Sequence, residues 1–116
     1  MAAGFLSSVP VALAGNTWTT VATAPGAGKQ RQILAVTPHN KDSVQHTYEG
    51  RLFKGAVEYL YNSATVDPSQ SGAPKSGELI SNSLNLVATD EVFQVRYEGA
   101  ATTTESECFV ALFEVP

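Results

Sequence analysis

The chain has 116 residues, of which 43% are hydrophobic and only 16% are charged, and its formal net charge at pH 7 is −4. A single domain of this length buries about two thirds of the surface that its unfolded chain exposes. The seven basic residues are spread from Lys29 to Arg96, so no basic patch for nucleic acid is expected. No apolar run reaches the length of a transmembrane helix, so no membrane partner is expected either.

The first 16 residues carry no charge, and the first charged residue of the chain is Lys29. This stretch has an A-x-A-like ending, as secretory signals do, but it lacks a positive N-terminal region and its apolar run is broken by serines and a proline. We therefore expect residues 1–16 to form an uncleaved, extended N-terminal arm on a protein that is not secreted. Residues 17–116 are expected to form one domain.

Beyond the arm, apolar and polar residues alternate with period two between turn residues, which predicts an all-β fold. Strands are predicted at residues 17–23, 30–37, 44–49, 56–61, 78–81, 84–87, 91–98 and 108–115. About eight strands suit two packed antiparallel sheets, so a jelly-roll-like sandwich is predicted. The third strand can continue through Leu52 and Phe53. Residues 62–77 hold two prolines and two glycines and are predicted to be irregular.

Alternation is clearest at residues 91–98, where Phe93, Val95 and Tyr97 are predicted to point inward. The strands at 91–98 and 108–115 are predicted to pair with each other. Cys108 begins the last strand, and we interpret it as a buried apolar side chain because nearby glutamates disfavour a reactive thiolate.

No motif for catalysis or cofactor binding is present. Gly28-Lys29 is followed by Gln30 and an apolar strand, whereas a phosphate loop needs Ser or Thr and then a helix, so "APGAGK" is interpreted as a turn. The two histidines, His39 and His46, do not have zinc-ligand spacing with the single cysteine. We therefore predict no catalytic, metal-binding or cofactor-binding residue, and a protein that is not an enzyme.

The aromatic residues leave two interpretations open. Tyr59 and Tyr61 share one face of a predicted strand, and Trp18 and Tyr48 are candidates to lie near them. Coplanar, exposed rings in a groove would favour a carbohydrate-binding module, whereas buried rings would simply fill the sandwich. Because a sandwich has open edges and few charged residues such as Lys54 and Glu58 can block them, self-association or docking onto a larger surface is also expected.

Two stretches resemble a small virion module of tailed bacteriophages, namely "TTVATAPGAGKQRQILAVTPHN" and "LISNSLNLVATDEVFQVRYEGAATTTESECFVALFEV". In that module a turn ending in Gly-Lys leads into an apolar strand that ends at an Asn, and a later L-x-L-x-x-x-D segment precedes the penultimate strand. The matching positions here are Gly28, Lys29, Asn40, Leu84, Leu86 and Asp90. The resemblance covers residues 17–115.

This resemblance implies a β-sandwich that is a structural building block of a virus particle, made in the host bacterial cytoplasm. Such modules serve as head decoration (cement) proteins, which is the function we expect, or as neck, tail or fibre components with a receptor- or carbohydrate-binding role. They are commonly trimers or rings. The implied partners are further copies of the chain, with a trimer favoured, and the major capsid protein or another virion protein.

The arm is the expected assembly interface. Its large apolar side chains are Phe5, Leu6, Val9, Val11 and Leu13. Burying each of them against a neighbour would contribute about 1.5–3 kcal/mol before ordering costs. Deleting residues 1–14 is expected to abolish assembly while the sandwich stays folded.

Overall fold

The computed structural model describes residues 4–5, 10–68, 75–80, 83–102 and 104–115. These residues form ten strands and no helix. In chain order the strands are β1 (Gly4–Phe5), β2 (Pro10–Ala12), β3 (Thr19–Ala22), β4 (Gln30–Asn40), β5 (His46–Lys54), β6 (Val57–Val66), β7 (Lys75–Ser76), β8 (Leu84–Leu86), β9 (Glu91–Tyr97) and β10 (Glu107–Val115).

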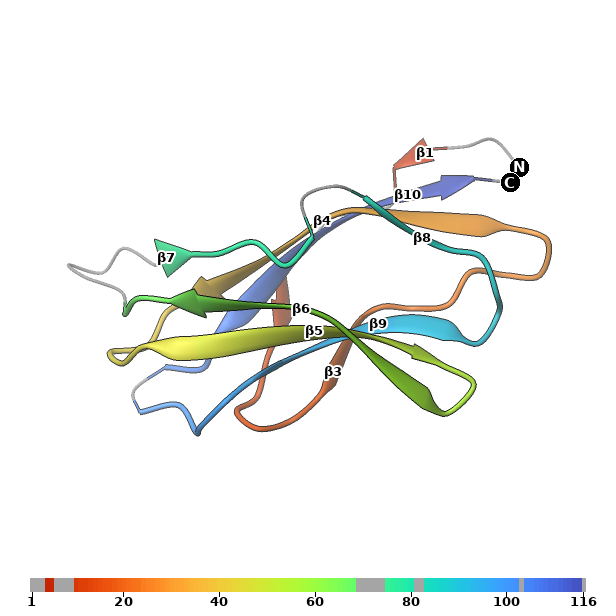
Figure 1. The fold of residues 1–116 in the computed structure, drawn as a ribbon. Helices are drawn as coiled ribbons and strands as arrows, with labels where there is room; N and C mark the ends of the chain where they lie inside the picture. The colour runs from red at the N-terminus through yellow and green to blue at the C-terminus, as the bar shows by residue number, and fades with distance from the viewer. Residues whose placement is uncertain (1–3, 6–9, 69–74, 81–82, 103, 116) are drawn as a thin grey trace.

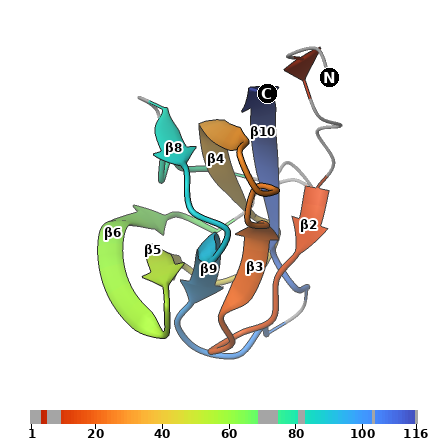
Figure 2. The same cartoon turned by 90° about the vertical axis from the view of Figure 1, so that its right-hand side faces the viewer.

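The strands form two stacked antiparallel sheets (Figures 1 and 2). In sheet A, β10 pairs with β4. β1 and β2 pair with the other edge of β10, and β7 and β8 pair with the other edge of β4. In sheet B the order is β3-β9-β5-β6. The prediction of an all-β, two-sheet antiparallel fold is confirmed.

The pairings are nested around one hairpin. β5 pairs with β6, the strand before this hairpin (β4) pairs with those after it (β7 and β8), β3 pairs with β9, and β1 and β2 pair with β10. The turn at the centre has two residues, Gly55 and Ala56, with φ values of 55° and 66°. Positive φ at both central residues is the geometry of a type I′ turn, whose twist matches that of the flanking strands.

Side chains from both sheets meet in one core. Phe93, Val95 and Tyr97 on β9 are fully buried, which confirms the predicted inward face of this strand. Ile33 and Val36 on β4 face them from sheet A. The remaining buried apolar residues of the core are Leu13, Val21, Ala22, Tyr48, Val66, Leu79, Ile80, Leu86, Cys108 and Val110.

The predicted pairing of the last two strands is wrong. β9 lies between β3 and β5 in sheet B, whereas β10 lies between β4 and the two N-terminal strands in sheet A. The connection between β9 and β10 therefore crosses from one sheet to the other. Alternation along a strand identifies the face that is buried, but it does not identify the neighbouring strand.

Several strand boundaries also differ from the prediction. β6 continues to Val66, so residues 62–66 of the predicted irregular stretch are strand. Of the strand predicted at 78–81, residues 78–80 form only an isolated bridge between Ile80 and Val36, and Ser81 lies outside the described residues. β4 passes through Pro38 to Asn40. The Pro38 carbonyl oxygen accepts a hydrogen bond from the Gly77 N–H (3.1 Å). Because the nitrogen and the carbonyl of a strand residue point to the same side, the Pro38 nitrogen, which has no hydrogen, also faces the side of β7 and β8, and no hydrogen bond to β10 is lost.

We predict that Gly50→Ala destabilises the protein by about 1–3 kcal/mol, the usual cost of overpacking a core. A Cβ atom at Gly50 would lie 2.6 Å from Cζ of the buried Phe93. Gly26→Ala is the matched control, because its Cβ would meet only Lys29 Cδ, at 3.6 Å. Urea denaturation of the two variants gives the comparison, and equal midpoints would contradict this packing.

Candidate assembly surfaces

The structure divides the five predicted interface residues of the arm. Phe5 lies in β1, which pairs with the end of β10, and Leu6 and Val9 lie outside the described residues. Val11 lies in β2 opposite Cys108 and packs against the core. Leu13 is 2% exposed, and its N–H donates to the Ser106 carbonyl oxygen at 3.0 Å.

Val11 and Leu13 therefore contribute to the core of their own chain. Deleting residues 1–14 would remove β2 and the Leu13 side chain, so the deletion would destabilise the sandwich as well as any contact with a neighbour. We therefore expect a deletion of this length to affect folding as well as assembly.

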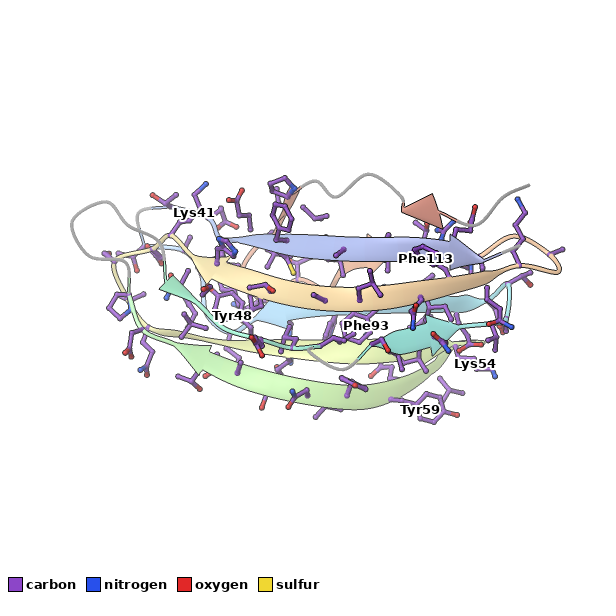
Figure 3. The ribbon with its side chains drawn as sticks, turned by 90° about the horizontal axis from the view of Figure 1, so that it is seen from above. Lys41, Tyr48, Lys54, Tyr59, Phe93 and Phe113 are labelled. Carbon is purple, nitrogen blue, oxygen red and sulfur yellow. The ribbon has the colours of Figure 1, made fainter. Side chains whose placement is uncertain are left out.

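Large exposed apolar side chains gather instead on β6. We call Val57, Tyr59, Leu60 and Tyr61 the β6 patch. Their exposed fractions are 48%, 52%, 66% and 43%, and the other large apolar side chains exposed among the described residues are Val44, Val87 and Phe109. Figure 3 shows Tyr59 projecting beyond the ribbon of β6. Four such side chains within five residues of one strand form a surface of the kind that mediates protein contacts.

The patch residues on the core face of β6 are exposed because sheet A does not cover this end of sheet B, whereas Leu60 lies on the outer face. Tyr59 lies opposite Leu52, which lies opposite the buried Phe93, so Tyr59 projects from the core face of its sheet. The Tyr61 ring packs edge-on against Phe93 with a centroid separation of 5.9 Å. Farther along β6 the core face is covered, since Val66 is buried.

The outer face of sheet B is polar and internally paired. Arg51 contacts Glu58 at 2.9 Å and donates through Nε to Gln94 Oε1 at 2.8 Å, and Arg96 contacts Glu49 at 2.7 Å. Both guanidinium groups lie over the Trp18 ring, at 4.1 Å for Arg51 and 4.7 Å for Arg96. These cation–π and ionic contacts join β5, β6 and β9 with Trp18, the residue before β3, across the outer face.

The four aromatic residues considered for carbohydrate binding do not form one surface. Tyr48 is fully buried, and Trp18 lies under the arginines of the outer face, whereas Tyr59 and Tyr61 project from the core face of β6. The interpretation that the aromatic rings fill the core is correct for Tyr48 and wrong for the two exposed tyrosines. No pocket was detected in the described part of the chain.

The histidines and the cysteine have structural environments. His39 stacks on the Phe109 ring with centroids 6.4 Å apart. Cys108 is buried as predicted, and burial raises the pKa of its thiol to about 12. Within the described ranges, no three His, Cys, Asp or Glu side chains converge as metal ligands do. Among the same residues, no helix is long and apolar enough to cross a membrane.

One polar cluster that the sequence patterns did not indicate is buried at one end of the sandwich. His46 Nε2 lies 2.7 Å from Asp42 Oδ2, and His46 Nδ1 lies 3.1 Å from the Glu98 carbonyl oxygen. The Asp42 carboxylate also accepts hydrogen bonds from the N–H groups of Ser43 (2.9 Å) and Thr102 (2.8 Å). Both ring nitrogens of His46 therefore lie within hydrogen-bonding distance of an oxygen atom.

Asn40 extends the cluster to the end of β6. Its side-chain amide donates to the carbonyl oxygens of Val44 (2.9 Å), Val66 (3.0 Å) and Asp67 (3.2 Å), and its Oδ1 accepts from the Asp42 N–H (2.9 Å). The cluster therefore joins the β4–β5, β6–β7 and β9–β10 connections. Its position and geometry assign it a structural role.

No protein-family model matches the chain, and no curated protein is significantly similar to it.

We predict that Asp42→Ala destabilises the protein by about 3–5 kcal/mol, because it removes the carboxylate beside the buried His46 ring and the acceptor of three partly buried backbone N–H groups, those of Ser43, Thr102 and Thr104. Glu107→Ala is the control. Glu107 pairs with Lys41 at 3.7 Å, and both side chains are about one-third exposed, so its loss should cost less than about 1 kcal/mol. Thermal and urea unfolding measure both values, and similar losses would contradict the role of the buried cluster.

Proposed function

We propose that this chain is a non-enzymatic structural component of a tailed-phage virion, and that it is a head decoration protein that stabilises the capsid through contacts between subunits. Its proposed partners are further copies of itself, with a trimer favoured, and the major capsid protein. Its proposed location is the virion, after synthesis in the host bacterial cytoplasm. The observation that carries the proposal is the β6 patch, an exposed apolar surface on an open sheet edge.

The strand order supports a jelly roll as the finer description of the fold. If β1 with β2, and β7 with β8, are each counted as one position, eight positions follow along the chain. Their order is 1-8-3-6 in one sheet and 2-7-4-5 in the other. Rolling up one long hairpin produces this order, and jelly rolls of this kind occur in viral capsid proteins and in lectins. The fold is therefore compatible with the proposal, although one fold can support several functions.

The environments of the charged residues also support a structural role. On the outer face of sheet B, Arg51 and Arg96 are paired with glutamates of the same chain. On sheet A, Arg31 contacts Glu114 at 2.9 Å, and this hydrogen bond holds the pKa of the Glu114 carboxyl below its ordinary value. These charges stabilise the sandwich itself, which leaves the apolar β6 patch as the surface best suited to a neighbouring protein.

We predict that particles of the encoding phage carry this protein over the whole head in a regular lattice. Cryo-electron microscopy and quantitative mass spectrometry of purified particles measure its position and copy number. Particles from a deletion strain should lose DNA at lower temperature, and added purified protein should restore their resistance. A single ring or fibre at one vertex would contradict decoration and favour the neck, tail or fibre alternative. Absence from purified particles would reject both.

A further inference from the structure

We propose that β6 is a contact between two copies of this chain. The two strands would pair antiparallel about a two-fold axis, with Tyr59 of one copy opposite Tyr59 of the other. This inference goes beyond the proposed virion role, because it names the residues and the symmetry of a contact that the isolated protein can make. A two-fold contact of this kind is an alternative to the trimer named above, and the mass of the isolated oligomer distinguishes the two.

β6 is the longest open edge among the described strands. It has ten residues and pairs only with β5. The other edge of sheet B, β3, has four residues, and beside it the Arg31 guanidinium donates to the Thr23 carbonyl oxygen at 3.0 Å. In sheet A, short strands cover the flanks of both β10 and β4. An open edge exposes backbone donors and acceptors that a further strand can satisfy.

The charges on β6 fit an identical strand. Proteins commonly protect an open edge with lysine, proline or an inward-pointing charge. β6 contains no lysine or proline, and its single charged residue, Glu58, is paired with Arg51 of the same chain at 2.9 Å. Lys54, the last residue of β5 before the hairpin turn, lies 3.9 Å from Glu91. A second copy therefore meets an edge without uncompensated charge, and β6 offers no charge that would select an acidic or basic partner.

The β6 patch supplies the apolar surface for this contact. Its four side chains project from both faces of β6, with Tyr59 on the core face and Leu60 opposite Arg51 on the outer face. Pairing would bring the core-face side chains of the two patches together on one side of the extended sheet. Burial of the tyrosine rings there favours association, while main-chain hydrogen bonds align the two strands.

Symmetry and charge select the register. A two-fold axis perpendicular to the sheet places the same face of both copies on one side. The axis therefore passes midway between one residue of the first copy and the same residue of the second, and these two residues lie opposite each other. An axis at Glu58 would set two carboxylates opposite each other, which is unfavourable. An axis at Tyr59 sets Val57 opposite Tyr61 and Glu58 opposite Leu60. It also keeps the contact ahead of Asn62, whose amide is bound to the Leu79 carbonyl oxygen at 3.2 Å.

We predict that the purified protein forms a concentration-dependent dimer in analytical ultracentrifugation. Tyr59→Lys should weaken the dimer at least about tenfold, because it sets two ammonium groups opposite each other. Phe109→Lys is the matched control: Phe109 is 41% exposed, against 52% for Tyr59, and lies on sheet A. This variant should retain the dimer. Circular dichroism and thermal unfolding of both variants verify that they fold.

A cross-linking experiment tests the register of the two β6 strands. Cys108, the only cysteine of the chain, is buried, so the wild-type protein is the background control. Tyr59→Cys should give a disulfide-linked dimer on mild oxidation, because directly opposite residues have Cβ atoms about 4.5–5.5 Å apart. Glu58→Cys, on the same edge, should give much less. Equal cross-linking of the two variants would overturn the register.

A monomer at every concentration would overturn the proposal, as would a dimer that Phe109→Lys disrupts and Tyr59→Lys does not. A monomer that uses Tyr59 to bind another virion protein would also overturn it, since the occupant of β6 would then be that protein. None of these outcomes bears on whether the protein is present in particles, so this inference and the proposed function can fail separately.

Discussion

The stacking of the two sheets depends on one constraint, which is that β9 must bury every second side chain between them. Phe93, Val95 and Tyr97 are fully buried, and β9 is central in sheet B, with β3 on one flank and β5 on the other. β5 accommodates the Phe93 ring because Gly50 has no side chain. Sheet A closes the core from above, with Ile33 and Val36 of β4 fully buried. Because protein interiors are close-packed, substitutions that change the volume of these side chains are poorly tolerated.

The sequence patterns predicted the faces of the strands better than their partners. Alternation correctly identified the buried face of β9, and the apolar surroundings of Cys108 correctly indicated its burial. The neighbours of β9 and β10 could not be predicted, because period-two patterning describes one strand at a time. The second half of β6 was missed because residues such as Asn62 and Ser63 are polar. An edge strand that faces solvent can use them, since β5 supplies the hydrogen bonds.

For the candidate surfaces, too, the sequence indicated the face of a strand but not what lies against it. Tyr59 and Tyr61 were recognised as sharing a face, and few charges were available to guard the sheet edges, but only the structure shows that this face lies beyond the cover of sheet A. The Asp42–His46 cluster has no signature in the sequence, because its partners come from connections that are far apart along the chain. For the N-terminal arm, the sequence showed the apolar side chains but not where they are buried. Leu13 is buried within its own domain.

The nested pairing of the strands has a consequence for how the chain reaches this structure. Among the described strands, only β5 and β6 pair as consecutive strands joined by a tight turn, and this two-residue turn can form early. Each further layer of pairing closes a longer loop, up to the contact of Gly4 with Glu114. Loop-closure entropy grows with this separation, and chains rich in such distant contacts fold slowly. We therefore expect folding to proceed outward from residues 55 and 56, with the pairing of β1 and β10 as a late step.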